Sequence, residues 1–309
     1  MGAASLRVIC GPTAAGKSAL VMALAERVPL TVISADSRQI YRGFDIGTAK
    51  PSAADRARVP HRGIDVVEPT ERYSAGRWAE GARRWIAEAE RAGRVPVVVG
   101  GTGFYVRALV APLFDEPALD TARRRAHERE LERLPTSELR RWCERLDPPR
   151  AHLGRAQLLR AALIALLTGV PLSAWHARAG RAPGRQARYL VVDPGGSLRE
   201  RIAHRTAGML AAGWEAEAAA LAERVPPDAP AWNATGYAII RSLVLGEMAR
   251  DDAIARIEAG TRQYAKRQRT WIRHQLPAGD VTALDPARGG ALARAMSWWC
   301  AEPEDEGRG

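Results

Sequence analysis

Eight consecutive residues near the start of the chain form a pattern that binds phosphate. They fit the spacing G-x-x-x-x-G-K-[ST] in full and are Gly11, Pro12, Thr13, Ala14, Ala15, Gly16, Lys17 and Ser18. The glycines let backbone amides turn towards phosphate oxygens, and the start of the following helix adds its positive dipole end. Lys17 brings a cation to the phosphates, and the Ser18 hydroxyl can bind Mg²⁺. The pattern predicts a P-loop, but kinase, NTPase and transferase chemistry all remain open.

The elements around this loop have the order that the pattern requires. A short apolar run at 6–10 predicts a buried strand before the loop, and residues 17–27 show a helical pattern after it. Further strands are expected at 30–34, 63–68, 95–99 and 188–193, listed here in chain order. Ser74 is expected to cap a helix that ends near Ala92. Because strands alternate with helices, we expect an α/β fold with a parallel sheet flanked by helices.

The middle of the chain has a different character. Residues 118–178 show only helical patterns and are rich in arginine, and the stretch 181–186 has the composition of a linker. Helical patterns then fill most of 197–275. We therefore expect a P-loop α/β core at 1–112 and 185–309, interrupted by an all-helical insertion domain at 113–184.

Composition narrows the class of protein. The chain has 309 residues and a net charge of +11, which favours a polyanionic partner such as nucleic acid. Because only three residues are lysine and the rest of the positive charge is arginine, the charge could equally reflect the base composition of the genome. Its three cysteines form no Cys-x-x-Cys pair, which argues against a zinc site and a disulfide framework. There is no signal peptide pattern and no apolar run long enough to span a bilayer. We expect a soluble, cytoplasmic monomer.

Several blocks of the sequence resemble one known family. Residues 36–51 read DSRQIYRGFDIGTAKP and are similar to the DS-x-Q-[VI]-Y-x-G-x-DIGTAKP block of the tRNA dimethylallyltransferases. Residues 100–105 resemble the family's GGTG-x-Y, and residues 261–268 resemble its TRQYAKRQ. Residues 201–217 fit its RI-x-x-R…M…G…E helix. The resemblance covers residues 6 to about 275 in the expected order.

The resemblance implies a reaction and its machinery. The family transfers a dimethylallyl group from dimethylallyl diphosphate to the exocyclic amine of the adenosine 3′ of the anticodon in tRNA, position 37, with Mg²⁺ and release of diphosphate. Asp36 matches the family's base, because a carboxylate can orient the weakly nucleophilic amine and take its proton. Lys17 and the loop amides would neutralise the leaving group, and Arg205 or Arg201 would add a bidentate clamp. Thr102 matches a position at the substrate channel, although it could equally cap the next helix.

The resemblance also implies contacts with the anticodon stem-loop. The adenine has to leave the loop's stack to reach a P-loop channel, and the amide of Gln39 has the donor and the acceptor needed to read its edge. Residues 262–273 carry five basic side chains and no acid, which suits an RNA backbone. The expected tRNA-contacting residues are Asp36, Ser37, Arg38, Gln39, Thr102, Arg124, Gln157, Arg160, Arg262, Lys266 and Arg267.

This sequence differs from the family pattern at some positions, and these differences leave other functions possible. Arg62 stands where the family usually has a second His, Gln157 where it has Arg, and Ala238 and Ile239 replace a base and an acid. These changes fall on parts that grip tRNA rather than on the phosphate chemistry. The alternatives are an isopentenyltransferase acting on free adenine nucleotides, a small-molecule kinase or NTPase using ATP, and a non-catalytic RNA-binding protein with a vestigial P-loop.

Overall fold

The chain forms two compact units. The computed structural model describes residues 5–111, 119–178 and 185–301. One unit comprises Met1–Val110 and Arg185–Gly309, and the other comprises Ala111–Gly184. Most of the stretch 181–186, which the sequence suggests as a linker, lies outside the described residues.

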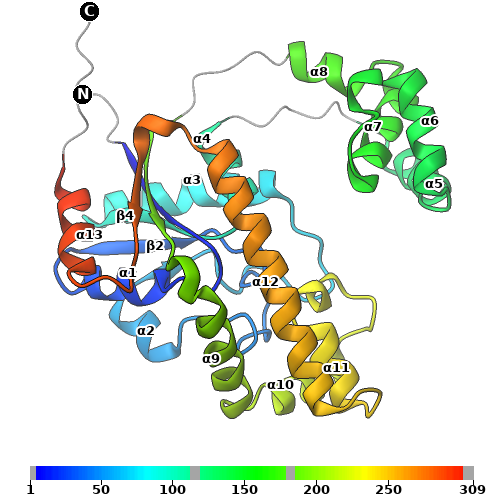
Figure 1. The fold of residues 1–309 in the computed structure, drawn as a ribbon. Coiled ribbons are helices and arrows are strands. Elements are labelled where there is room, and N and C mark those ends of the chain that lie inside the picture. Colours follow the sequence, from blue (N-terminus) through cyan, green and yellow to red (C-terminus); the bar gives the residue numbers. More distant parts are fainter. Residues whose placement is uncertain (1–4, 112–118, 179–184, 302–309) are drawn as a thin grey trace, which may run out of the picture. The chain divides into compact units, whose positions relative to one another are not determined.

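The first unit is built on a parallel sheet of six strands in the order β3-β2-β4-β1-β5-β6 (Figure 1). The strands are β1 (Leu6–Cys10), β2 (Leu30–Ser34), β3 (His61–Arg62), β4 (Val95–Gly100), β5 (Ala187–Val192) and β6 (Val281–Leu284). In the centre of the sheet, Val8 of β1 is in register with Val98 of β4 and Tyr189 of β5. All five residues of β2 are buried, as continuous apolar runs in a sheet covered on both faces require.

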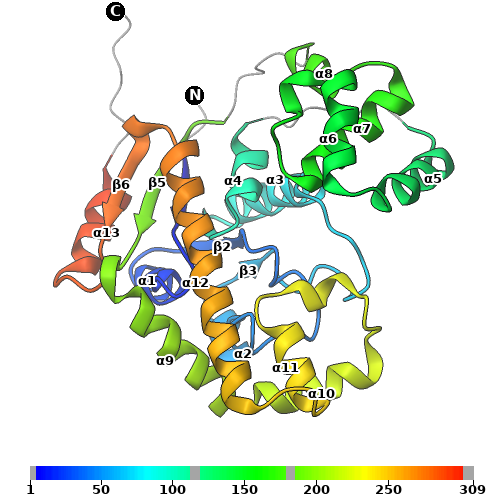
Figure 2. The same cartoon turned by 45° about the vertical axis from the view of Figure 1, so that its right-hand side comes forward.

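Helices surround this sheet, and some of them carry the site (Figures 1 and 2). They are α1 (Lys17–Ala25), α2 (Ala53–Arg58), α3 (Ala75–Arg91), α4 (Gly103–Val110), α9 (Leu198–Ala211), α10 (Trp214–Arg224), α11 (Tyr237–Val244), α12 (Arg250–Gln275) and α13 (Ala291–Cys300). Ser74 caps α3, as the sequence predicts, because its hydroxyl accepts a hydrogen bond from the Arg77 amide at 3.2 Å. The main core packs strand residues against α1 and against Trp298 and Trp299 of α13.

The second unit has its own hydrophobic core. Its helices are α5 (Thr121–Glu132), α6 (Thr136–Leu146), α7 (Arg155–Thr168) and α8 (Leu172–Arg178). Leu139 and Cys143 of α6 are fully buried, and they pack with Leu158 and Ala162 of α7. Within the ranges that the structure describes, no helix is both long and apolar enough to cross a membrane.

The prediction of a strand at 63–68 is wrong. β3 consists of His61–Arg62 alone, and beyond it Val67 forms only an isolated bridge with Tyr41. The chain cannot continue as a strand because Asp65 has φ 55°, in the left-handed region. This conformation accompanies the hydrogen bonds that its carboxylate makes with Lys50 and Arg56. A side-chain interaction has here replaced the β-ladder that the local sequence favours.

Candidate active site

The P-loop connects β1 to α1. At its start, a Cβ added to Gly11 would lie 2.1 Å from the carbonyl oxygen of Val192, so no other residue fits. The Lys17 ammonium donates to the carbonyl oxygens of Gly11 at 3.0 Å and Pro12 at 2.7 Å. Burial lowers the pKa of Lys17 to about 8, the nearby Arg205 charge also lowers it, and the Asp36 charge opposes both.

Two arginines of α9 have different roles beside this loop. Arg201 donates from Nε to the carbonyl oxygen of Ala14 at 3.0 Å, so it supports the loop. Arg205 makes no hydrogen bond or ion pair with the residues that the structure describes. Burial lowers the pKa of Arg205 and the Asp36 charge raises it, but a guanidinium stays charged in proteins. Arg205 is therefore the one of the two that is available to an anionic ligand.

Two cavities meet beside the P-loop. The larger has about 950 Å³ of empty space, and its walls include Lys17 and Ser18. The smaller has about 530 Å³, and its walls include Arg38 and Tyr264. The residues that line both cavities are Thr13, Asp36, Thr48 and Arg205. A carboxylate and a guanidinium thus lie where the two cavities join.

Asp36 follows β2, and only one of its two carboxylate oxygens is hydrogen-bonded within the described residues. Its Oδ1 accepts the backbone N–H of Arg38 at 2.8 Å, and within the described chain its Oδ2 has no hydrogen-bond partner. The Nε of Arg38 is buried and also lacks a partner among the described residues. The end of this strand therefore carries an acceptor, the Asp36 Oδ2, and a buried donor, the Arg38 Nε, neither of which is hydrogen-bonded within the described residues.

The hydroxyl of Thr102 holds the loop that carries Asp36. It accepts the backbone N–H of Ser37 at 3.0 Å, donates to the Ser37 hydroxyl at 3.3 Å, and makes a hydrogen bond with Tyr264 of α12. The first amides of α4 instead bond the backbone carbonyl of Thr102, as with the Tyr105 amide at 2.9 Å. The side chain therefore connects loops at the site, while the capping role belongs to the backbone.

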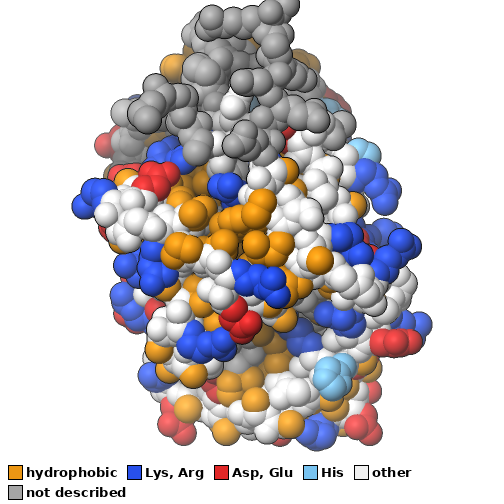
Figure 3. All heavy atoms as spheres, turned by 90° about the vertical axis from the view of Figure 1, so that its left-hand side faces the viewer, with side chains coloured by type: hydrophobic (Ala, Val, Ile, Leu, Met, Phe, Trp, Pro, Cys, Tyr) orange, Lys and Arg blue, Asp and Glu red, His pale blue; other side chains and the backbone are white. Residues whose placement is uncertain are grey.

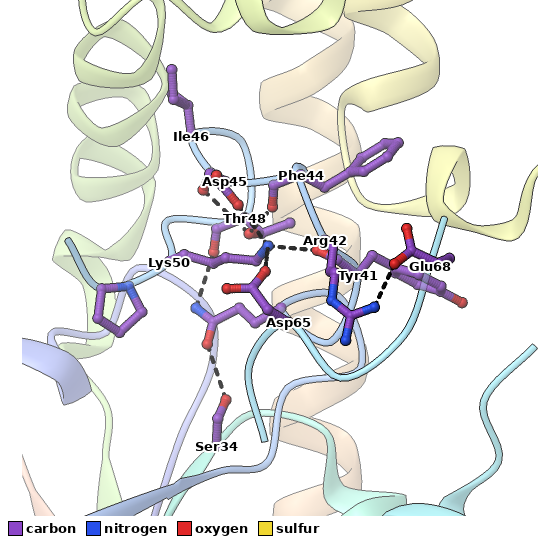
Figure 4. Close-up of polar contacts among 12 residues, drawn as sticks. Ser34, Tyr41, Arg42, Phe44, Asp45, Ile46, Thr48, Lys50, Asp65 and Glu68 are labelled. Atoms are coloured by element: carbon purple, nitrogen blue, oxygen red, sulfur yellow. Dashed lines mark hydrogen bonds and ion pairs between the residues drawn. The ribbon is translucent and has the colours of Figure 1, made fainter. Parts of the chain in front are cut away.

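A buried lysine organises the loop 36–51 (Figure 4). The side chain of Lys50 is 1% exposed, and its ammonium contacts the carbonyl oxygen of Tyr41 and the carboxylates of Asp45 and Asp65, the latter two at 2.6 Å. Arg56 binds the other oxygen of Asp65 at 2.7 Å. Burial would raise the pKa of Asp65, but hydrogen bonds and charge from Lys50 and Arg56 outweigh it and lower that pKa. The positions of Lys50, Asp45 and Asp65 in the sequence thus have a structural role in this chain.

The amide of Gln39 is occupied by the same loop. Its Oε1 accepts from the Ser34 hydroxyl at 3.0 Å, and its Nε2 donates to the carbonyl oxygens of Thr48 at 3.2 Å and Ala49 at 3.1 Å. Adenine recognition by Gln39 stays a prediction, and it requires these contacts to be exchanged.

Two residues that the sequence does not mark as functional hold the far end of this loop. Glu217 of α10 accepts the backbone N–H groups of Asp45 at 3.0 Å and Ile46 at 2.8 Å. The Tyr237 hydroxyl accepts the N–H of Gly47 at 3.0 Å and donates to Glu217. Burial and the Glu217 charge raise the pKa of Tyr237 strongly, so it stays a donor. For Glu217, the match of residues 201–217 to the family's helix pattern was the signal that could have identified it.

Three basic residues of α12 lie on one face of the helix. Arg262, Lys266 and Arg269 recur at helical spacing, and Tyr264, Gln268 and Trp271 recur in the same way on another face. Arg262 pairs with Glu258 at 3.4 Å, and Arg269 pairs with Asp193 in the loop after β5. Lys266 and Arg267 are exposed, with the Arg267 guanidinium 5.7 Å from the centre of the Tyr264 ring. Part of the basic stripe therefore stabilises the fold.

Three predicted RNA-binding residues belong to the second unit. Arg124 on α5 is half-buried and Arg160 on α7 is exposed. The Gln157 side chain caps α7, because its Oε1 accepts the backbone N–H of Gly154 at 3.3 Å. A surface contact between Gln157 and RNA stays a prediction alongside this capping role.

One face of the molecule shows how charged side chains are distributed on it. On the face viewed from the side of α13, Lys and Arg side chains surround a central area of hydrophobic side chains and alternate with acidic ones (Figure 3). A nucleic-acid surface requires basic groups clustered on one face. This face does not have that pattern.

The donor set at the P-loop fits magnesium brought by a phosphate ligand. Among the described residues, no group of three or more His, Cys, Asp or Glu side chains could hold a metal ion. Ser18 and Asp36 supply one hydroxyl and one carboxylate to the larger cavity. Mg²⁺ commonly takes one or two protein oxygens and fills its shell with substrate phosphates and water. These residues fit such an ion, with Ser18 as the P-loop ligand.

Comparison with known proteins agrees with this geometry. The model of the IPP transferase family matches residues 39–275, and that of the isopentenyl transferase family matches residues 4–60. The tRNA dimethylallyltransferase of Anaeromyxobacter sp. (strain K) is 40% identical over 290 residues, covering 90% of this chain and 95% of the relative. That of Acaryochloris marina (strain MBIC 11017) is 38% identical over 278 residues, covering 87% and 89%.

Two crystal structures extend the similarity to three dimensions. The tRNA isopentenylpyrophosphate transferase from Bacillus halodurans has a TM-score of 0.68 at 31% identity, with 96% of each chain covered. A eukaryotic dimethylallyltransferase acting on tRNA has a TM-score of 0.80 at 26% identity, covering 96% of this chain and 78% of that one. The similarity thus includes both the P-loop unit and the helical unit.

Proposed function

Because this chain belongs to the IPP transferase family, we propose that it transfers a dimethylallyl group from dimethylallyl diphosphate to the N6 amine of adenosine 37 in tRNA, releasing diphosphate. The observation that carries the proposal is the junction of two cavities at Asp36 and Arg205, beside the P-loop. A leaving diphosphate and an incoming amine can meet at this point, each with a group of complementary charge.

The side chains at the junction have different roles in the reaction. The allylic C–O bond breaks with its electron pair going to the diphosphate, and the lone pair of the adenine amine forms the new C–N bond. The loop amides, Lys17 and Arg205 neutralise charge on the diphosphate, since preorganised donors stabilise charge as it develops. Asp36 orients the amine through its unpartnered Oδ2 and takes the proton that the amine loses. Thr102 keeps Asp36 in place through Ser37.

Magnesium and tRNA complete the assignment. Bound by Ser18 and the diphosphate, Mg²⁺ would supply further neutralisation of the leaving group. We assign Arg38 and Ser37 to the flipped adenosine, and the basic residues Arg262, Lys266 and Arg267 to the RNA backbone. The helical insertion, 113–184, is assigned to the anticodon stem, with contacts from Arg124, Gln157 and Arg160. We place this monomeric enzyme in the cytoplasm with its tRNA.

A second acceptor class is supported by one observation. Residues 4–60, which contain the P-loop and Asp36, match the isopentenyl transferase family as well. These residues would serve equally for an isopentenyltransferase that acts on free adenine nucleotides. The helical insertion favours tRNA, because a free nucleotide needs no second unit to hold it.

The reaction class is tested by following diphosphate release. The purified protein is incubated with Mg²⁺, dimethylallyl diphosphate and unmodified tRNA, and released diphosphate is converted to phosphate by a pyrophosphatase and counted. We expect release only when both substrates are present. Phosphate released from ATP without tRNA or prenyl donor would instead identify a kinase or NTPase.

A further inference from the structure

One side chain of α12 connects the P-loop to the loop that follows β4. The Oε1 of Gln268 accepts the backbone N–H of Thr13 at 2.8 Å, and its Nε2 donates to the carbonyl oxygen of Gly101 at 3.0 Å. Gln268 is only 7% exposed. Figures 1 and 2 both show α12 passing beside α9 and the sheet. Gln268 therefore bridges two loops that the sequence separates widely.

The chemistry of these contacts requires an amide. The group at this position has to accept from an N–H and donate to a carbonyl at once, which Glu cannot do when ionised and Lys cannot do at all. The approach is also close, because a Cβ added to Gly101 would lie 2.1 Å from the Gln268 Nε2. A buried polar group of this kind is costly unless it is paired, and here both ends are paired.

The part of the P-loop next to this bridge is strained. Ala14 has φ 61°, a left-handed conformation that is unfavourable for a residue with a Cβ. Such a conformation persists only where surrounding contacts fix it. Gln268 holds the Pro12–Thr13 peptide through the Thr13 N–H, and Arg201 holds the Ala14 carbonyl, so contacts flank Ala14 on both sides. The bend in the loop is thus fixed from outside the loop.

We propose that Gln268 is a positioning residue for the diphosphate site, which keeps the P-loop in its phosphate-binding conformation without binding the diphosphate itself. The inference rests on the proposed function only in naming the ligand as the diphosphate of the prenyl donor. The other end of the bridge is the Gly101 carbonyl, so the same side chain holds the P-loop against the loop that follows β4.

The test replaces Gln268 by Leu, which keeps most of its volume and removes both hydrogen bonds. We expect the Kd for inorganic pyrophosphate and the KM for dimethylallyl diphosphate to rise about tenfold, while kcat and the Kd for tRNA change less than about threefold. Hydrogen exchange should become faster in the peptide 11–18 and stay unchanged in the β5 region. Gln275→Leu, which alters an exposed glutamine of the same helix, is the matched control.

The outcomes separate this inference from the proposed function. Wild-type protein that binds no pyrophosphate and makes no prenylated tRNA would overturn the proposed function. Active wild-type protein, with Gln268→Leu equal to it in pyrophosphate affinity, donor KM and loop exchange, would overturn the positioning role alone. If the Leu variant does not fold, Gln268→Met, with an unbranched side chain of similar length, gives the same comparison.

Discussion

Asp36 lies at the junction of both cavities, and within the described residues its Oδ2 has no hydrogen-bond partner. This position predicts the effect of replacing the Asp36 carboxylate. In Asp36→Asn the side chain can still accept the Arg38 amide, so the loop keeps its shape, but it can no longer take a proton. We expect the single-turnover rate at saturating substrates to fall about 10²–10⁴-fold, with both substrate affinities within about threefold. The surface variant Asp228→Asn is the control. A normal rate with weakened tRNA binding would contradict the role as base.

The lowered pKa of Lys17 predicts that binding of the prenyl donor depends on pH. Burial lowers its pKa to about 8, and only the protonated form attracts diphosphate. The affinity for pyrophosphate should therefore be steady below that pKa and decline as pH rises through it, well before an ordinary lysine titrates. Calorimetric titration between pH 7 and 10 measures this decline. Lys17→Met should bind weakly at every pH and show no such decline, and an equal decline in that variant would assign it to another group.

At the scale of elements, the loop 36–51 depends on the buried Lys50. Lys50→Met leaves Asp45 without its cation and Asp65 with Arg56 alone, and we expect a loss of about 2 kcal/mol, since both acids retain some access to water. Thermal unfolding should show a Tm lower by roughly 4–8 °C. Arg42→Met removes the exposed pair with Glu68 on the same loop and should cost less than about 1 kcal/mol. Similar shifts in the two variants would show that Lys50 has no special structural role.

The elements differ in how far local sequence predicts them. The strands β1, β2 and β4 were predicted because buried parallel strands are continuous apolar runs, and these predictions are confirmed, as is the α/β class. The strand β6 was missed because it has four residues, of which only Leu284 is buried. The helices α2 and α13 were also not predicted. Gly63–Glu68 was wrongly predicted because its conformation follows from Lys50 and Arg56.

Local sequence also predicts only part of the candidate site. The P-loop and Asp36 are local patterns, so sequence identifies them directly. The contacts that hold them come from residues distant in sequence: Gln268 on Thr13, Arg201 on Ala14 and Glu217 on Asp45. Such contacts exist only after the sheet has brought these helices together. For the same reason, the sequence could not show that the Gln39 amide is hydrogen-bonded to Ser34 and Thr48, and adenine recognition by Gln39 stays a prediction.

At the scale of the whole molecule, the helical unit should supply tRNA affinity without affecting the diphosphate site. Replacing Arg124 and Arg160 by Gln removes two positive charges from this unit. We expect weaker tRNA binding with a salt dependence reduced by about two counterions, and unchanged pyrophosphate binding. Filter binding at several salt concentrations measures this slope. The control pair Arg288→Gln and Arg294→Gln lies in the first unit. An equal effect of both pairs would show that only net charge matters.

The identity of the acceptor is the central claim, and one measurement tests it most directly. The protein is incubated with Mg²⁺ and dimethylallyl diphosphate together with either unmodified tRNA or AMP, and the products are digested and examined by mass spectrometry. We predict a dimethylallyl group on a single adenosine of the tRNA, at position 37, and none on AMP. Prenylated AMP with unmodified tRNA would contradict the claim and make the chain a free-nucleotide isopentenyltransferase.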